Sequence, residues 1–241
     1  GTVLSFVLFL LVMPRWAALR WSESRPWAAL GIRGAKPQKQ PAPAAALLKG
    51  LLIAAGLLMV ITSVVLIDGS GNWRGEVDAT QLTNAVLLCL GVGFAEELIF
   101  RSWLWTELQE MIGSRRAAWA QAGIFSLVHT RFNLGLGAMG GLLIGLFLLG
   151  MVLARQRQSD RGSLWGCIGL HGGLVAGWFL LQNGLLQLSP NAPPWLVGPG
   201  GHSPNPLGGL IGILSLLILL LIQRTAVANA LRPSTGARRA S

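Results

Sequence analysis

Charged residues are scarce in this sequence. They make up 12% of its 241 residues and hydrophobic residues make up 52%. A typical soluble domain carries about 25% charged residues. A surface that faces water needs the missing charge, whereas a surface that faces lipid does not. The composition therefore excludes an ordinary soluble domain and predicts an integral membrane protein.

Cysteine is also scarce. The two cysteines, Cys89 and Cys167, both lie inside apolar runs. In such surroundings a free cysteine behaves as a small buried hydrophobic residue. Two isolated cysteines give neither a disulfide framework nor a metal-binding motif.

Seven apolar runs predict an all-α fold, a polytopic transmembrane bundle of about seven helices, because only a helix or a closed barrel satisfies its own backbone in lipid. The first is too short to span a bilayer alone, which takes about 20 residues. We expect it to be a membrane helix whose beginning is missing here, with a signal peptide as the alternative. The runs are Thr2–Met13, Leu47–Ile67, Leu82–Trp105, Ala117–Thr130, Asn133–Leu153, Leu164–Leu181 and Leu207–Gln223.

Basic residues alternate between the two sides of this predicted bundle. They cluster after every second crossing, whereas the loop from Gln182 to Pro206 contains no acidic residue, lysine or arginine. By the positive-inside rule, the basic loops and the C-terminus are predicted to be cytoplasmic. The net charge of +10 belongs to this pattern. We therefore expect the lipid bilayer as a partner and no nucleic acid.

Three ionisable side chains interrupt the third run: Glu96, Glu97 and Arg101. Each costs on the order of 3 kcal/mol at mid-bilayer on insertion scales, so they must point inward and be compensated. Glu97 and Arg101 are four residues apart, which predicts an ion pair on one helical face. Glu96 is rotated about 100° away, so it is left without that partner and is suited to be a general base. A polar clamp that only fixes helix packing is the alternative.

Two of the three histidines also lie within apolar runs. His129 shares a helical face with Phe125, and His171 lies in a glycine-rich part of the sixth run. Two histidines on helices other than that of the glutamates predict a common site. Counting residues from the run ends places His129 about 10 Å deeper than Glu96, so a common site requires helix tilt or a later start of the fourth helix. His202 lies in the outer loop and receives no role.

In these motifs the sequence resembles the CAAX protease and bacteriocin-processing family, also called Abi, whose eukaryotic members are the type II CAAX prenyl endopeptidases. The family pattern is Glu-Glu-x-x-x-Arg, then Phe-x-x-x-His, then His-x-x-x-Asn or Asp, on three membrane helices in this order. The resemblance covers roughly residues 82–181, and Val175 stands where the third motif has Asn or Asp. The matching residues are Glu96, Glu97, Arg101, Phe125, His129 and His171.

The resemblance implies an intramembrane endopeptidase that hydrolyses a peptide bond of a membrane-associated or lipidated protein or peptide. It assigns the activation of a water molecule to Glu96 and His129, and the stabilisation of the oxyanion to His171. Glu97, Arg101 and Phe125 receive supporting roles. No cofactor is expected. Zinc bound by one glutamate and two histidines is the alternative, although the sequence has no His-Glu-x-x-His helix.

Because Val175 stands at the Asn or Asp position of the third motif, two other functions are considered. The valine lacks the oxyanion donor expected at this position, and losing one such donor costs other enzymes about 100- to 1000-fold in rate. A non-catalytic membrane scaffold or chaperone would keep the buried cluster for packing. A transporter would use buried Glu and His as a proton relay, but no pair of broken helices in matching halves supports one.

The predicted organisation has three parts. Residues 1–45 hold the first membrane helix and a basic cytoplasmic linker. Residues 46–224 form the membrane-embedded catalytic domain. Residues 225–241 form a basic cytoplasmic tail.

Overall fold

The computed structural model describes residues 2–33, 40–201 and 203–230. Over these residues the chain is an all-α helical bundle, as predicted, and each of the seven apolar runs corresponds to a helix. His202, part of the predicted linker and residues 231–241 of the predicted tail lie outside the described residues. The seven helices are α1 (Thr2–Arg20), α3 (Pro43–Ile67), α4 (Ala79–Glu97), α6 (Ser114–His129), α7 (Leu136–Ser159), α8 (Trp165–Leu180) and α10 (Leu210–Ala230).

Three helical segments in the described ranges are both long and apolar enough to cross a membrane: Pro43–Ile67, Ala79–Ile112 and Leu136–Ser159. A shorter apolar helix covers Leu210–Arg224. The chain is thus a membrane protein, while the count of seven crossings stays a prediction.

The remaining elements are short. The strands β1 and β2 pair antiparallel, with Gly71 opposite Leu188 and Trp73 opposite Leu186. This ribbon ties the segment after α3 to the segment after α8, so the predicted outer loop contains ordered structure. The short elements are α2 (Pro26–Ala29), β1 (Gly71–Trp73), the π-helical turn η1 (Leu98–Leu104), α5 (Trp105–Ile112), the π-helical turn η2 (Leu181–Leu185), β2 (Leu186–Leu188), α9 (Pro194–Val197) and the 3-10 turn η3 (Pro206–Gly208).

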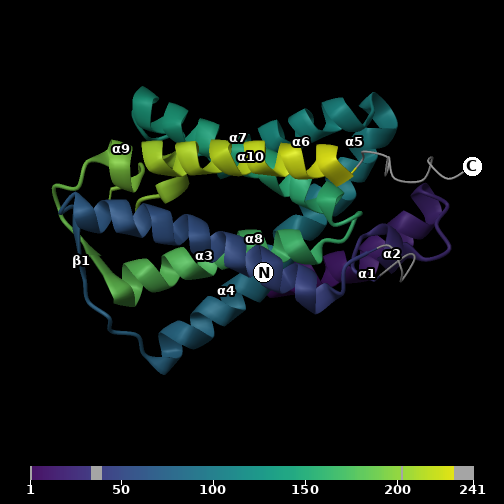
Figure 1. The fold of residues 1–241 in the computed structure, drawn as a ribbon. Helices are drawn as coiled ribbons and strands as arrows, with labels where there is room; N and C mark the ends of the chain where they lie inside the picture. Colours follow the sequence, from purple (N-terminus) through teal and green to yellow (C-terminus); the bar gives the residue numbers. More distant parts are fainter. Residues whose placement is uncertain (1, 34–39, 202, 231–241) are drawn as a thin grey trace, which may run out of the picture.

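The helices form two layers. In Figure 1, α6, α7 and α10 lie above α3, α4 and α8, and pairs of helices within each layer pack most extensively. The main apolar core fills the space between the layers and includes Leu58, Phe125, Leu149 and Leu174. The candidate site lies in the same space, because Phe125 is also part of the predicted second motif.

Glycines set the spacing inside the lower layer. A Cβ atom at Gly169 of α8 would lie 2.2 Å from the carbonyl oxygen of Leu47 in α3. A Cβ atom at Gly172 would lie 2.2 Å from the carbonyl oxygen of Cys89 in α4. Small residues at these positions let the helix backbones approach closely. His171, between the two glycines, is thereby held against α4.

Candidate active site

The two glutamates lie in the last turn of α4, and Arg101 lies in the π-helical turn η1 that follows it. Glu97 Oε1 is 3.0 Å from Arg101 Nη1, and both side chains are fully buried. The ion pair predicted from the four-residue spacing is therefore present. The π turn was not predicted; such wide turns are common at functional sites.

Glu97 has a second partner that the sequence did not indicate. His171 Nδ1 lies 2.8 Å from Glu97 Oε1, the oxygen that also contacts Arg101. A carboxylate only accepts hydrogen bonds, so Nδ1 of His171 carries a hydrogen and donates it. Glu97 thus fixes the tautomer and the orientation of His171.

His129 is oriented by its own helix. Its Nδ1 atom lies 2.8 Å from the Phe125 carbonyl oxygen, so Nδ1 must donate. Its Nε2 atom lies 3.0 Å from Glu96 Oε2. A neutral imidazole protonated on Nδ1 and a carboxylate have no hydrogen to share at this contact. One proton carried by the Glu96–His129 pair would make this contact attractive.

Such a proton would balance the charge of the four side chains Glu96, Glu97, Arg101 and His129. The two carboxylates supply two negative charges, and Arg101, in contact with Glu97, supplies one positive charge. A proton on the Glu96–His129 pair would supply the second positive charge. Burial in low dielectric favours such neutrality.

Phe125 packs against Arg101, His129 and His171 and is 1% exposed. The guanidinium carbon of Arg101 lies 4.1 Å from the centre of its ring, which is cation–π geometry. The ring centre of His129 lies 4.3 Å away and that of His171 lies 5.6 Å away, edge to face. These contacts are consistent with the supporting role proposed for Phe125.

Glu96, His129 and His171 meet at the wall of a cavity of about 330 Å³. Glu96 Oε2 is 3.7 Å from His171 Nε2 as well as 3.0 Å from His129 Nε2. The side chains of Glu96 and His129 are 25% and 29% exposed, whereas His171 is 6% exposed. We call these three residues the trio. Glu97 and Arg101 lie behind it, away from the cavity.

The predicted difference in depth between His129 and Glu96 was wrong. The two side chains are in contact, although α6 begins at Ser114, earlier than the predicted run. The estimate assumed straight helices that start at the ends of the apolar runs. In the structure the helix of Glu96 continues through the π turn and α5 to Ile112, so counting from the predicted end at Trp105 misplaced Glu96.

Residues 78–177 match the family described as type II CAAX prenyl endopeptidase Rce1-like. The match supports the family predicted from the three motifs. The matched range begins at Asp78, which caps α4, and contains all six predicted site residues. Rce1-like proteins are proteases, which supports a hydrolase with a peptide or protein substrate. No curated protein and no solved structure matches the chain.

The chain departs from the family's third motif at Val175. Val175 lines the cavity one helical turn beyond His171. Its side chain offers no hydrogen-bond donor there. The remaining polar residues of the cavity wall, Gln182, Arg131, Ser203 and Asn205, belong to its other end, near the loop that follows α9.

Arg157 is a contributor that the sequence did not reveal. The apolar run of its helix ends at Leu153, but α7 continues to Ser159. This extension brings the Arg157 guanidinium to the carbonyl oxygen of Arg101, to which it donates a hydrogen bond. The positive-inside rule explains the basic residues of this segment only as topology signals.

Within residues 2–33, 40–201 and 203–230, no group of three or more His, Cys, Asp or Glu is arranged to hold a metal ion. The Nδ1 atoms of His129 and His171 are engaged by Phe125 and Glu97. Only their Nε2 atoms and Glu96 face the cavity.

Proposed function

We propose that this chain is an intramembrane endopeptidase that cleaves a membrane-associated or lipidated protein or peptide with a water molecule activated by Glu96. The observation that carries the proposal is the convergence of the trio on one cavity. One carboxylate oxygen lies 3.0 Å and 3.7 Å from the Nε2 atoms of two histidines on separate helices. This geometry gives a base and a donor within reach of one water molecule and one carbonyl group.

The hydrogen bonds support a division of roles between the two histidines. Because Nδ1 of His171 donates to Glu97, His171 can donate to an oxyanion only when both of its nitrogens are protonated. A proton transferred from Glu96 to His171 would protonate its second nitrogen, and the buried Glu97 carboxylate would stabilise the resulting positive charge of His171. Glu96 and His129 Nε2 are then free to accept the proton of the attacking water. That proton leaves on the amine of the cleaved bond.

The proposed setting follows from the charge pattern. We place the basic loops and the C-terminus in the cytoplasm, in a multi-pass topology with seven crossings. The catalytic domain is residues 46–224. The reaction uses no metal or other cofactor, because the charge-balanced trio already provides a base and an oxyanion donor.

The decisive variant is Glu96→Gln. It keeps the size of the side chain and removes the base, so we expect a loss of cleavage of about 100- to 10,000-fold. The measurement compares the protein termini of membranes from cells that carry the wild type or the variant. Glu110→Gln, on the exposed surface of α5, is the matched control and should cleave normally. Unchanged cleavage by Glu96→Gln at equal protein levels would refute the proposed base.

One observation favours a second candidate, a non-catalytic membrane scaffold. Val175 leaves this part of the cavity wall apolar, and the Glu97–Arg101 pair is fully buried, as a packing clamp would be. A scaffold predicts that Glu96→Gln lowers stability and changes no protein termini. The protease proposal predicts that Glu96→Gln keeps its stability and changes the protein termini.

A further inference from the structure

Three successive backbone carbonyl groups, those of residues 30–32, accept hydrogen bonds from two different helices. The pairs are Ser102 Oγ with the Leu30 carbonyl (2.9 Å), the Leu164 backbone N–H with the Gly31 carbonyl (3.0 Å) and Trp165 Nε1 with the Ile32 carbonyl (2.9 Å). The first donor lies in η1, which continues the helix of the two glutamates. The other two lie at the start of α8, the helix of His171.

The segment 30–32 is fixed against its neighbours. Leu30 and Ser102 are 0% exposed, so their hydrogen bond has no competition from water. Gly31 has a φ of +81°, which favours glycine. A Cβ atom there would also lie 2.4 Å from the Gly162 carbonyl oxygen, just before α8. The backbone of the segment therefore lies as close to α8 as a chain can.

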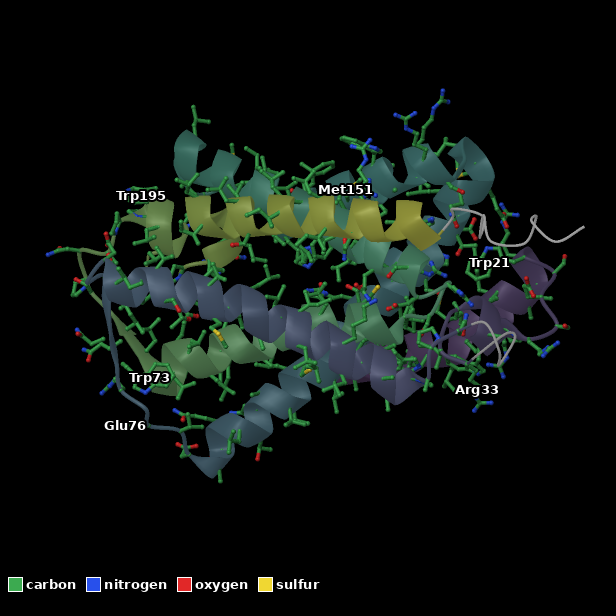
Figure 2. The ribbon with its side chains drawn as sticks, viewed as in Figure 1. Trp21, Arg33, Trp73, Glu76, Met151 and Trp195 are labelled. Carbon is green, nitrogen blue, oxygen red and sulfur yellow. The ribbon has the colours of Figure 1, made fainter. Side chains whose placement is uncertain are left out.

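The two anchored points lie at similar distances from the site. Ser102 follows Glu97 by five residues and Trp165 precedes His171 by six, which is about 7–9 Å along each helix. Because Glu97 and His171 are in contact, both anchors lie at the same end of the bundle. Figure 2 shows Arg33, the residue that follows the segment, at the end where α1 and α2 lie.

The helix of the glutamates has less direct contact with α8 beyond Glu97. Within the described ranges, α8 packs extensively against α3 and α4 but not against η1. The close approach of α4 to α8 at Gly172 lies on the other side of Glu97. Beyond it, Leu30 belongs to one buried apolar cluster with Leu98 and Leu164. The segment 30–32 thus bridges the two helices where they separate.

From these observations we infer that the segment 30–32 positions α4 and α8, with Ser102 and Trp165 as positioning residues. Neither side chain lines the cavity. They act by setting the distance between Glu96 Oε2 and His171 Nε2, which is 3.7 Å. A displacement of about 1 Å at a reacting group can cost an enzyme about 100-fold in rate. The inference rests on the proposed protease function.

Removing the two side-chain hydrogen bonds tests this role. Ser102→Ala and Trp165→Phe should each lower kcat by about 10-fold and together by about 100-fold, with KM changed by less than about threefold. The substrate is a membrane protein whose cleavage depends on Glu96. Thr106→Val and Trp119→Phe are the matched controls and should keep the wild-type kcat. The Thr106 hydroxyl bonds within its own helical segment, and Trp119 is exposed.

A second measurement needs no substrate. The chain has three histidines, so protein with nitrogen-15-labelled histidine, purified without a histidine tag, gives few imidazole signals in NMR. The variant His171→Gln assigns those of His171. Because Nδ1 of His171 bonds to Glu97 (2.8 Å), its signal reports the contact between the two helices. We expect it to shift in Ser102→Ala and Trp165→Phe, to shift further in the double variant, and to stay in place in both controls.

The two measurements separate this inference from the proposed function. If the His171 signal shifts as expected but no cleavage depends on Glu96, the positioning of the helices stands and the protease proposal fails. If cleavage depends on Glu96 but the double variant matches the wild type in kcat and in the His171 signal, the protease stands and the inference is overturned. A lower kcat without a shift of the signal, a shift without a lower kcat, or a loss of rate that lies in KM would overturn it too.

Discussion

Removing the positive charge of Arg101 should destabilise the protein strongly. Arg101 and Glu97 are both fully buried and 3.0 Å apart. Arg101→Met keeps much of the side-chain volume but leaves the Glu97 carboxylate with His171 as its remaining partner. Breaking a buried pair in this way costs about 3–5 kcal/mol. With roughly 2–4 °C lost per kcal/mol in a chain of this size, the melting temperature should fall by about 6–20 °C.

The assay is thermal unfolding of the detergent-solubilised protein, with Arg101→Met, Glu97→Gln and the double variant measured together. Because the double variant leaves no unpaired charge in this pair, it should lose less stability than the sum of the two single variants, by about 1–3 kcal/mol. Arg20→Met is the control, since Arg20 is half-exposed and its pairs with Glu107 and Glu110 are 3.6 Å long. Such surface pairs contribute about 0–1 kcal/mol. Additive losses, or an Arg101→Met variant as stable as Arg20→Met, would refute the buried-pair reasoning.

Three further outcomes are expected. Gly145→Ala should cost about 1–3 kcal/mol in unfolding experiments, because the new Cβ would lie 1.9 Å from the Leu207 carbonyl oxygen. Gly137→Ala, on the same helix with no atom within 4 Å of the new Cβ, should be neutral or slightly stabilising; equal losses would contradict the packing argument. Val175→Asn should raise kcat by up to about 100-fold with little change in KM, since it adds a donor beside His171; an unchanged kcat would show that no donor is needed there. Prolonged treatment with a zinc chelator should leave the cleavage rate unchanged, and loss of activity that zinc restores would instead establish the zinc alternative.

Much of the site could be predicted because the membrane restricts what polar residues can do. A charged side chain in lipid is costly, so Glu96, Glu97 and Arg101 had to point into the bundle. Helical geometry then paired Glu97 with Arg101, and the structure contains this pair at 3.0 Å. Glu96 was left for the cavity, where its side chain is 25% exposed. Each of these steps depended on spacing within one helix.

The rest could not be predicted because it depends on how helices lie against one another. The contact between Glu97 and His171 joins residues 74 positions apart. The close approach of α8 to α4 at Gly172 makes that contact possible. Hydropathy marks only the apolar part of a helix, so the fifth predicted run ends at Leu153 although α7 continues to Ser159. The contact of Arg157 with the Arg101 carbonyl oxygen lies in this unpredicted part of the helix.

The structure also supports the proposal that Glu96, and not its neighbour Glu97, is the base. Glu97 Oε1 already accepts hydrogen bonds from Arg101 and His171, and the whole side chain is fully buried behind the trio. A carboxylate held by two donors gains little by taking another proton. Glu96 faces the cavity and lies 3.0 Å from His129, so a proton carried by this pair could be exchanged with water without disturbing the buried Glu97–Arg101 pair. In the proposed mechanism the two adjacent glutamates therefore have separate roles: Glu97 maintains the geometry of His171, and Glu96 reacts.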